Sequence, residues 1–125
     1  MKKIKWVLIL ILVGLISLII YLFTQVGNEP AKLEAFAKCL KNSGAVFYGT
    51  FWCLHCQNQK KLFGKSAKFL PYVECSTADG RAQLPICREK NIQGYPTWEF
   101  ADKSRLVGEI PLKTLSEKTN CSLPN

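Results

Sequence analysis

Two cysteines three positions apart, Cys53 and Cys56, are the residues whose types and spacing best fit a chemical role. They follow an apolar stretch at residues 45–51 and precede a helical pattern, which predicts a strand-to-helix junction. A thiolate at a helix N-terminus is stabilised by unpaired N–H groups and by the helix dipole. We therefore expect Cys53 to be the nucleophile, with its pKa lowered from about 8.5 into the range of about 3.5–7.5. Cys56, one turn into the helix and more buried, is expected to resolve the mixed disulfide.

His55, the single histidine, lies between these cysteines. A positively charged imidazole beside a thiolate stabilises the reduced pair, which makes its disulfide a better oxidant. Gln57 follows Cys56, whereas a c-type haem site needs histidine there. A zinc site built from an irregular cysteine set and a purely structural 53–56 disulfide remain as alternatives. We expect neither a metal site nor a bound cofactor.

The elements around the pair follow from apolar periodicity and from turn residues. A helix is expected from Pro30 and Ala31 onward, ended by Gly44 at its C′ position. The other expected elements are a strand at 45–51, a helix from the cysteine pair to about Leu70, a strand at 72–75, a helix at 85–91, strands at 97–101 and 105–109, and a helix at 112–119. This order predicts an α/β fold with a central mixed sheet flanked by helices.

The N-terminus carries a membrane signal. Residues 6–23 contain no charge and would span about 27 Å as a helix, close to the hydrocarbon core of a bilayer. The lysines at positions 2, 3 and 5 predict a cytoplasmic N-terminus and an exported domain. We expect one transmembrane signal anchor and linker at 1–28 and a domain at 29–125; a cleaved signal peptide and a buried core helix are the alternatives.

Composition agrees with export and disfavours nucleic acid as a partner. The net charge is 17 − 9 = +8, but no Lys/Arg run exceeds two residues and aromatic residues are not interleaved with basic patches. Six cysteines in 125 residues favour an oxidising compartment or metal binding.

Two motifs resemble the thioredoxin fold: Trp52-Cys53-x-x-Cys56 after an apolar strand, and Gly94-Tyr95-Pro96-Thr97 some forty residues later. The resemblance implies that Pro96 is a cis-proline facing the cysteine pair and that the Tyr95 backbone pairs with substrate. Ordinary thioredoxins carry a buried Asp six residues before the first cysteine, where this chain has Phe47. That departure, like His55, favours oxidation or isomerisation over general reduction.

The resemblance can be narrowed to one group of thioredoxin-like domains by four segments, residues 48–57, 62–64, 70–75 and 94–99. They resemble the thioredoxin-like domain fused to, or encoded alongside, bacterial homologues of vitamin K epoxide reductase. In that family the domain shuttles disulfides between a quinone-linked membrane enzyme and exported proteins. The resemblance implies that this chain is a separate, singly anchored partner of such an enzyme.

Four cysteines lie outside the motif. Cys75 and Cys87 recur as a pair in the resembled family; if joined, they would close a loop worth roughly 3 kcal/mol. Cys39 and Cys121 would then tie the two ends of the domain, although four cysteines allow three connectivities. We expect both pairs to be structural, with a second redox relay at 75–87 as the alternative.

Two surface features complete the expectations. The side chains of Trp52, Leu54, Tyr95 and Pro96 either form an apolar rim for an unfolded substrate strand or simply pack. The lysines at 60, 61, 65 and 68 are expected on a solvated helix face.

The sequence thus predicts a membrane-anchored, extracytoplasmic thiol–disulfide oxidoreductase acting on protein thiols, in the oxidase or isomerase direction. The alternatives are a dedicated reductase in cytochrome or metal-centre assembly and a non-catalytic metal-binding or chaperone module.

Overall fold

The computed structural model describes residues 1–26 and 32–124, and the chain forms two compact units, Met1–Pro30 and Ala31–Asn125. The expected domain boundary between residues 28 and 29 and the expected helix start at Pro30 and Ala31 lie outside the described residues.

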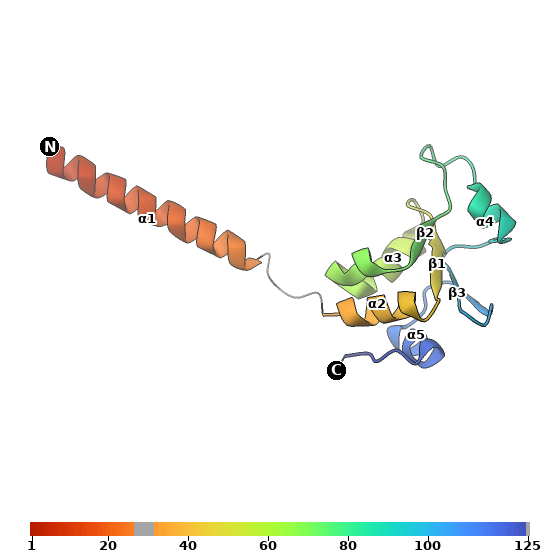
Figure 1. The fold of residues 1–125 in the computed structure, drawn as a ribbon. Coiled ribbons are helices and arrows are strands. Elements are labelled where there is room, and N and C mark those ends of the chain that lie inside the picture. Colours follow the sequence, from red (N-terminus) through yellow and green to blue (C-terminus); the bar gives the residue numbers. More distant parts are fainter. Residues whose placement is uncertain (27–31, 125) are drawn as a thin grey trace. The chain divides into compact units, whose positions relative to one another are not determined.

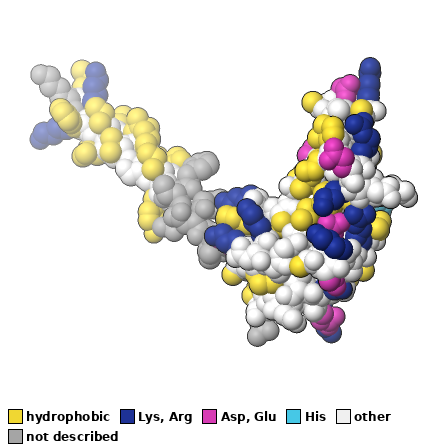
Figure 2. Space-filling view, turned by 45° about the vertical axis from the view of Figure 1, so that its right-hand side comes forward, with side chains coloured by type: hydrophobic (Ala, Val, Ile, Leu, Met, Phe, Trp, Pro, Cys, Tyr) yellow, Lys and Arg dark blue, Asp and Glu magenta, His cyan; other side chains and the backbone are white. Residues whose placement is uncertain are grey.

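The first unit contains helix α1 (Lys2–Val26). Its segment Lys3–Leu22 has a mean hydropathy of 2.6 and is long and apolar enough to cross a membrane. Large apolar side chains from Ile4 to Leu22 are about half exposed or more, and Figure 2 shows hydrophobic atoms along much of this helix with lysines at its start. A signal sequence near an N-terminus can also be long and apolar enough to meet these criteria.

The second unit is built on a mixed four-stranded sheet (Figure 1), with the order β2 (Tyr72–Glu74), β1 (Val46–Gly49), β3 (Thr97–Glu99) and β4 (Arg105–Val107). Strand β1 pairs with β2 in parallel and with β3 antiparallel, and β3 pairs antiparallel with β4. The predicted α/β thioredoxin-like fold with a central mixed sheet is therefore confirmed.

Helices cover both faces of the sheet. Figure 1 shows α2 (Glu34–Asn42), α3 (Leu54–Phe63) and α5 (Leu112–Thr119) on one side of the strands and α4 (Pro85–Glu89) on the other. Successive side chains of a strand point to opposite faces. Accordingly, Phe47 joins the larger core with Trp98, while Tyr48 joins a smaller core with Ile92 and the 75–87 cysteines.

The helix that follows the cysteine pair is shorter than its apolar pattern predicted. It ends at Phe63, and the chain continues as a 3₁₀ helix, η1 (Gly64–Phe69). Gly64 has a φ of +52°, a conformation that interrupts an α-helix and that glycine adopts readily. The hydroxyl of Ser66 then accepts a hydrogen bond from the Leu33 N–H at 3.0 Å, which ties this turn to the start of α2.

Candidate active site

The two motif cysteines lie at the N-terminus of α3, as predicted. Cys53 is the N-cap residue, and its Sγ accepts a hydrogen bond from the Cys56 N–H at 3.4 Å. Both are free thiols, yet they differ in exposure: 8% of Cys53 and 1% of Cys56 is accessible. An incoming sulfur therefore reaches Cys53 more readily than Cys56.

The loop that ends at Pro96 faces Cys53. The Cys53 thiol donates a hydrogen bond to the Tyr95 carbonyl oxygen at a Sγ–O distance of 3.6 Å. The Tyr95–Pro96 peptide bond is cis, as the resemblance implied. The Pro96 carbonyl accepts a hydrogen bond from the Gly108 N–H at 2.8 Å, so β4's end fixes this loop opposite the redox pair.

Cys56 is enclosed more tightly. A Cβ at Gly49 would lie 2.9 Å from the Cys56 Sγ and 2.9 Å from a ring carbon of Tyr72, so no side chain fits there. Burial raises the pKa of the Cys56 thiol to about 12, with the adjacent Cys53 acting in the same direction and the backbone of Thr50 opposing it. Cys56 is thus held as a thiol.

Charged groups approach Cys56 from α3 and β2. The Lys60 Nζ lies 3.3 Å from the centroid of the Tyr72 ring, whose hydroxyl donates to the Glu74 carboxylate at 2.7 Å. Burial lowers the pKa of Lys60, and its positive charge in turn lowers that of Cys56. The lysines at 61, 65 and 68 are exposed, as expected of a solvated face, whereas Lys60 is only partly exposed and its ammonium packs on the Tyr72 ring.

Phe47 occupies the position at which ordinary thioredoxins carry a buried aspartate, and it packs against apolar side chains. Phe47 is fully buried and stacks on Trp98 with 4.9 Å between ring centroids. A carboxylate, that of Glu74, instead accepts a hydrogen bond from the Tyr72 hydroxyl and acts on the Lys60 ammonium. Sequence reasoning missed this group because Glu74 and Lys60 meet only through the packing of α3 against the sheet.

His55 is exposed and paired. Its Nδ1 lies 2.6 Å from the Glu109 Oε1, which also accepts a hydrogen bond from the Asn58 amide at 3.1 Å. The hydrogen bond from His55, and then that from Asn58, lowers the pKa of Glu109. A carboxylate therefore holds the histidine of the motif in place.

Gln59 fixes the segment that carries this carboxylate. Its side chain is fully buried, donates to the Ile110 carbonyl at 3.0 Å and accepts from the Ile110 N–H at 2.6 Å. Neither Gln59 nor Glu109 was predicted. One signal was present: Gln59 shares a helical face with Cys56 and Phe63, and a buried amide needs partners.

The side chains that were expected to form an apolar rim differ in their exposure. Trp52 and Leu54 are 52% and 62% exposed, and the neighbouring Phe51 is 49% exposed. Tyr95 is half-buried with its ring edge-on to Trp52, whereas Pro96 is buried. Three exposed apolar side chains thus border Cys53.

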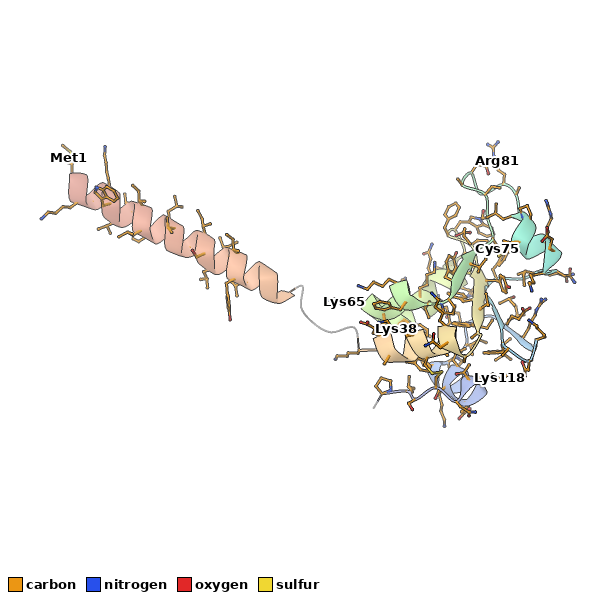
Figure 3. All side chains as sticks on the ribbon, viewed as in Figure 1. Met1, Lys38, Lys65, Cys75, Arg81 and Lys118 are labelled. Carbon is orange, nitrogen blue, oxygen red and sulfur yellow. A yellow bond between two sulfur atoms is a disulfide. The ribbon has the colours of Figure 1, made fainter. Side chains whose placement is uncertain are left out.

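The remaining cysteines form two disulfides, Cys39–Cys121 and Cys75–Cys87. The first joins α2 to the residue after the αL cap of α5. The second closes the loop that reaches Arg81, and Cys75 lies at its base in Figure 3. These are the pairs that the resemblance and the expected tie between the domain ends implied. Within residues 1–26 and 32–124, no three His, Cys, Asp or Glu side chains gather as a metal would require.

No known protein family profile matches the chain. It is similar to "Thiol-disulfide oxidoreductase LTO1" of Arabidopsis thaliana, with 47% identity over 108 residues that cover 82% of this chain and 28% of that protein. It is also similar to "Protein disulfide isomerase-like 5-1" of Oryza sativa subsp. japonica, with 28% identity over 89 residues, 65% of this chain and 60% of that protein. The chain thus spans less than two thirds of either relative.

Proposed function

We propose that this chain is a protein thiol–disulfide oxidoreductase of the thioredoxin-like superfamily that acts through Cys53 and Cys56. The observation that carries the proposal is the placement of the Cys53 Sγ at the start of α3, 3.6 Å from the Tyr95 carbonyl. The names of both plant relatives describe the same chemistry and support it.

In the oxidising direction, a substrate thiolate attacks the Cys53 sulfur of the Cys53–Cys56 disulfide. The bond between the two cysteines breaks, and Cys56 leaves as a thiolate and takes up a proton. A second substrate thiolate then attacks the substrate sulfur of the mixed disulfide and releases Cys53. The substrate loses two electrons and two protons, and the redox pair gains them. The Tyr95 backbone docks the substrate beside Cys53, as the geometry of the loop allows.

The oxidase or isomerase direction is part of the proposal. His55 lies between the two cysteines in the sequence, and the Glu109 carboxylate holds its imidazole at 2.6 Å. An imidazolium next to a thiolate stabilises the reduced pair and so raises the reduction potential. A measured potential of about −120 to −180 mV supports this direction, whereas about −270 mV would indicate a dedicated reductase.

We further propose that α1 anchors the domain in a membrane, with the lysines at 3 and 5 on the cytoplasmic side and the domain outside the cytoplasm. The two disulfides agree with an oxidising compartment. A quinone-linked membrane enzyme resembling vitamin K epoxide reductase would then accept the two electrons and reoxidise the pair.

Thiol exchange by the full chain in lipid vesicles tests the activity. Cys53→Ser should abolish disulfide transfer to a reduced, unfolded protein, while Cys56→Ser should accumulate a mixed disulfide visible by mass spectrometry. The control is the circular dichroism spectrum of each variant, which should match that of the wild-type chain because both disulfides remain in place. Full exchange by Cys53→Ser would overturn the proposal.

A further inference from the structure

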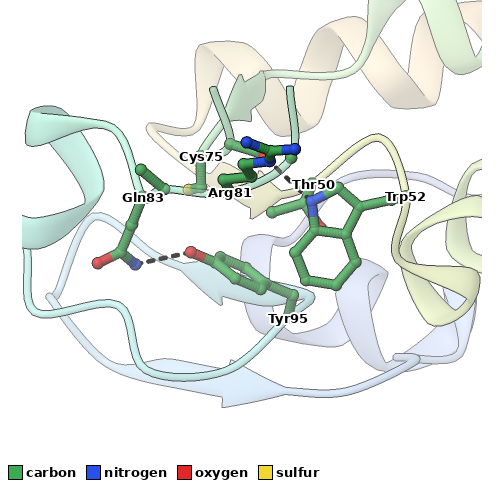
Figure 4. Close-up of a pocket in the computed structure, with 9 residues that line it drawn as sticks. Thr50, Trp52, Cys75, Arg81, Gln83 and Tyr95 are labelled. Carbon is green, nitrogen blue, oxygen red and sulfur yellow. Dashed lines mark hydrogen bonds between the residues drawn. The ribbon is translucent and has the colours of Figure 1, made fainter. Parts of the chain in front are cut away.

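A cavity of about 150 Å³ opens beside the redox motif. Trp52, which precedes Cys53, forms one wall, and Tyr95, whose carbonyl faces the Cys53 thiol, forms another (Figure 4). The loop closed by the 75–87 disulfide completes the cavity and brings Arg81 and Gln83 to it. A dry cavity of this volume holds a benzene molecule, so it has room for one small side chain.

The loop that forms this cavity is held in a defined shape. The Trp52 Nε1 donates to the Ser76 hydroxyl at 2.9 Å, and the Gln83 amide donates to the Tyr95 hydroxyl at 2.6 Å and to the Ile92 carbonyl at 2.7 Å. Gly80 has a φ of +72° and lies against the Trp52 ring. The redox motif, the Pro96 loop and the disulfide-closed loop are therefore joined around the cavity.

Several hydrogen-bond donors at the cavity have no partner among the described residues. The Tyr95 hydroxyl already accepts from Gln83, so its own hydrogen remains to be donated, and no described residue accepts it. The Thr50 hydroxyl is buried and also lacks a partner among the described residues. The Arg81 guanidinium makes no hydrogen bond or ion pair within the described part of the chain. Among the residues that the structure describes, no acidic side chain lines the cavity.

These donors match a carboxylate, which only accepts hydrogen bonds and pairs well with arginine. In the proposed exchange, a substrate joined to Cys53 by a mixed disulfide would lie beside the Tyr95 carbonyl, which contacts the Cys53 thiol. Successive residues of an extended chain are about 3.3 Å apart, so a residue one or two places from the substrate cysteine can turn its side chain into the cavity. A substrate side chain is thus a better occupant than a free anion, because the mixed disulfide delivers it to this position.

We propose that this cavity is a specificity subsite that receives an Asp or Glu side chain one or two positions from the reactive cysteine of the substrate. Arg81 and the Tyr95 hydroxyl contact the carboxylate, with the Thr50 hydroxyl behind them. The inference rests on the proposed thiol–disulfide exchange and names the kind of substrate site that it favours.

The test measures how fast the oxidised full chain, in lipid vesicles, reacts with short unstructured peptides that contain one cysteine. The peptides differ only in the residue next to the cysteine, which is Glu, Gln or Lys. Each rate is divided by the rate with which the same peptide reduces glutathione disulfide, since a neighbouring charge also alters the intrinsic reactivity of the peptide thiol. The corrected rate with the Glu peptide should be about three to five times the corrected rate with the Gln peptide, which is the effect of one partly exposed charge pair.

Arg81→Glu should invert this selectivity, so that the Lys peptide becomes the fastest of the three. Tyr95→Phe should lower the Glu-to-Gln ratio without inverting it, because it removes a donor and no charge. The matched control is Arg88→Glu, which makes the same charge change on α4 at a residue outside the cavity and should leave the ratio unchanged.

Two results separate this inference from the proposed function. A Glu-to-Gln ratio that is the same in the wild-type chain and in Arg81→Glu overturns the subsite, even while Cys53→Ser still abolishes exchange. No reaction of the wild-type chain with any of the three peptides overturns the proposed exchange itself.

Discussion

The His55 imidazole and the Glu109 carboxylate are hydrogen-bonded across 54 positions of sequence, with 2.6 Å between Nδ1 and Oε1. The contact exists because Gln59, on the same helix as His55, clamps the backbone of Ile110. The redox motif is thus positioned from outside the motif itself, by the segment that follows β4.

The exposure of the two thiols predicts one-sided chemical labelling. In the reduced chain at about pH 7, iodoacetamide should modify Cys53 and leave Cys56, which is 1% exposed and whose pKa burial raises to about 12. Peptide mapping by mass spectrometry identifies the labelled residue. Denaturant should make both cysteines reactive, and equal labelling in the native protein would contradict the asymmetry.

The same pKa predicts a loss of stability at alkaline pH. Because the folded-state pKa of Cys56 lies above the unfolded value of about 8.5, the folded reduced chain retains a proton that the unfolded chain releases. This contribution is fully present below about pH 8.5 and is lost as the pH rises toward 12. The free energy of unfolding of the reduced chain should therefore fall more steeply above about pH 9 than that of Cys56→Ser, and parallel curves would refute the assignment.

Replacing His55 should make the disulfide a weaker oxidant. His55→Ala removes the imidazole, the group of the motif whose protonated form would stabilise the reduced pair, and a tenfold change in the equilibrium with glutathione corresponds to about 30 mV. If Glu109 acts by holding His55, the same substitution should have a smaller effect in the Glu109→Gln background. Redox titration of the four proteins measures the coupling, and strictly additive effects would show that the two residues act independently.

Gln59→Leu should destabilise the domain by about 2–4 kcal/mol, since it leaves a buried N–H and a buried carbonyl of Ile110 without partners. Denaturant unfolding at constant pH provides the measurement. Gln93 is exposed, so Gln93→Leu makes the same chemical change and should shift the stability by less than about 0.5 kcal/mol. Similar losses in both variants would mean that the clamp contributes nothing.

Removing one or the other of the two disulfides should lower the free energy of unfolding by different amounts. Replacing Cys39 and Cys121 by serine opens a loop with a sequence separation of 82, and replacing Cys75 and Cys87 opens one with a separation of 12. Chain entropy then predicts losses of about 4.5 and about 3 kcal/mol. Unfolding experiments on both variants, with the Cys53–Cys56 pair reduced, give the two values, and the reverse order would count against this entropic account.

Local patterns in the sequence predicted the elements that carry the thiols. The apolar run before Cys53 and the helical periodicity after it are signals within one segment, so the strand, the helix start and the position of Cys53 between them could be predicted. The same periodicity predicted the wrong end for this helix. Ala67 and Leu70 continue the apolar pattern, whereas the positive φ of Gly64 ends the α-helical conformation.

Contacts between distant segments could not be predicted from the sequence. A buried Gln59 and an exposed His55 each need a partner, but nothing in their own segment says that these partners are Ile110 and Glu109. The cavity beside Trp52 likewise depends on how the 75–87 loop folds back over the motif, which its polar composition did not reveal.

The Cys39–Cys121 bond closes residues 39–121 into a covalent ring. A protease that cuts the backbone once between these cysteines leaves both fragments attached to each other and, through residues before Cys39, to the N-terminal helix. The second disulfide is nested inside this ring. A molecule nicked inside this ring therefore remains on the membrane, if that helix is its anchor, for as long as its outer disulfide is intact.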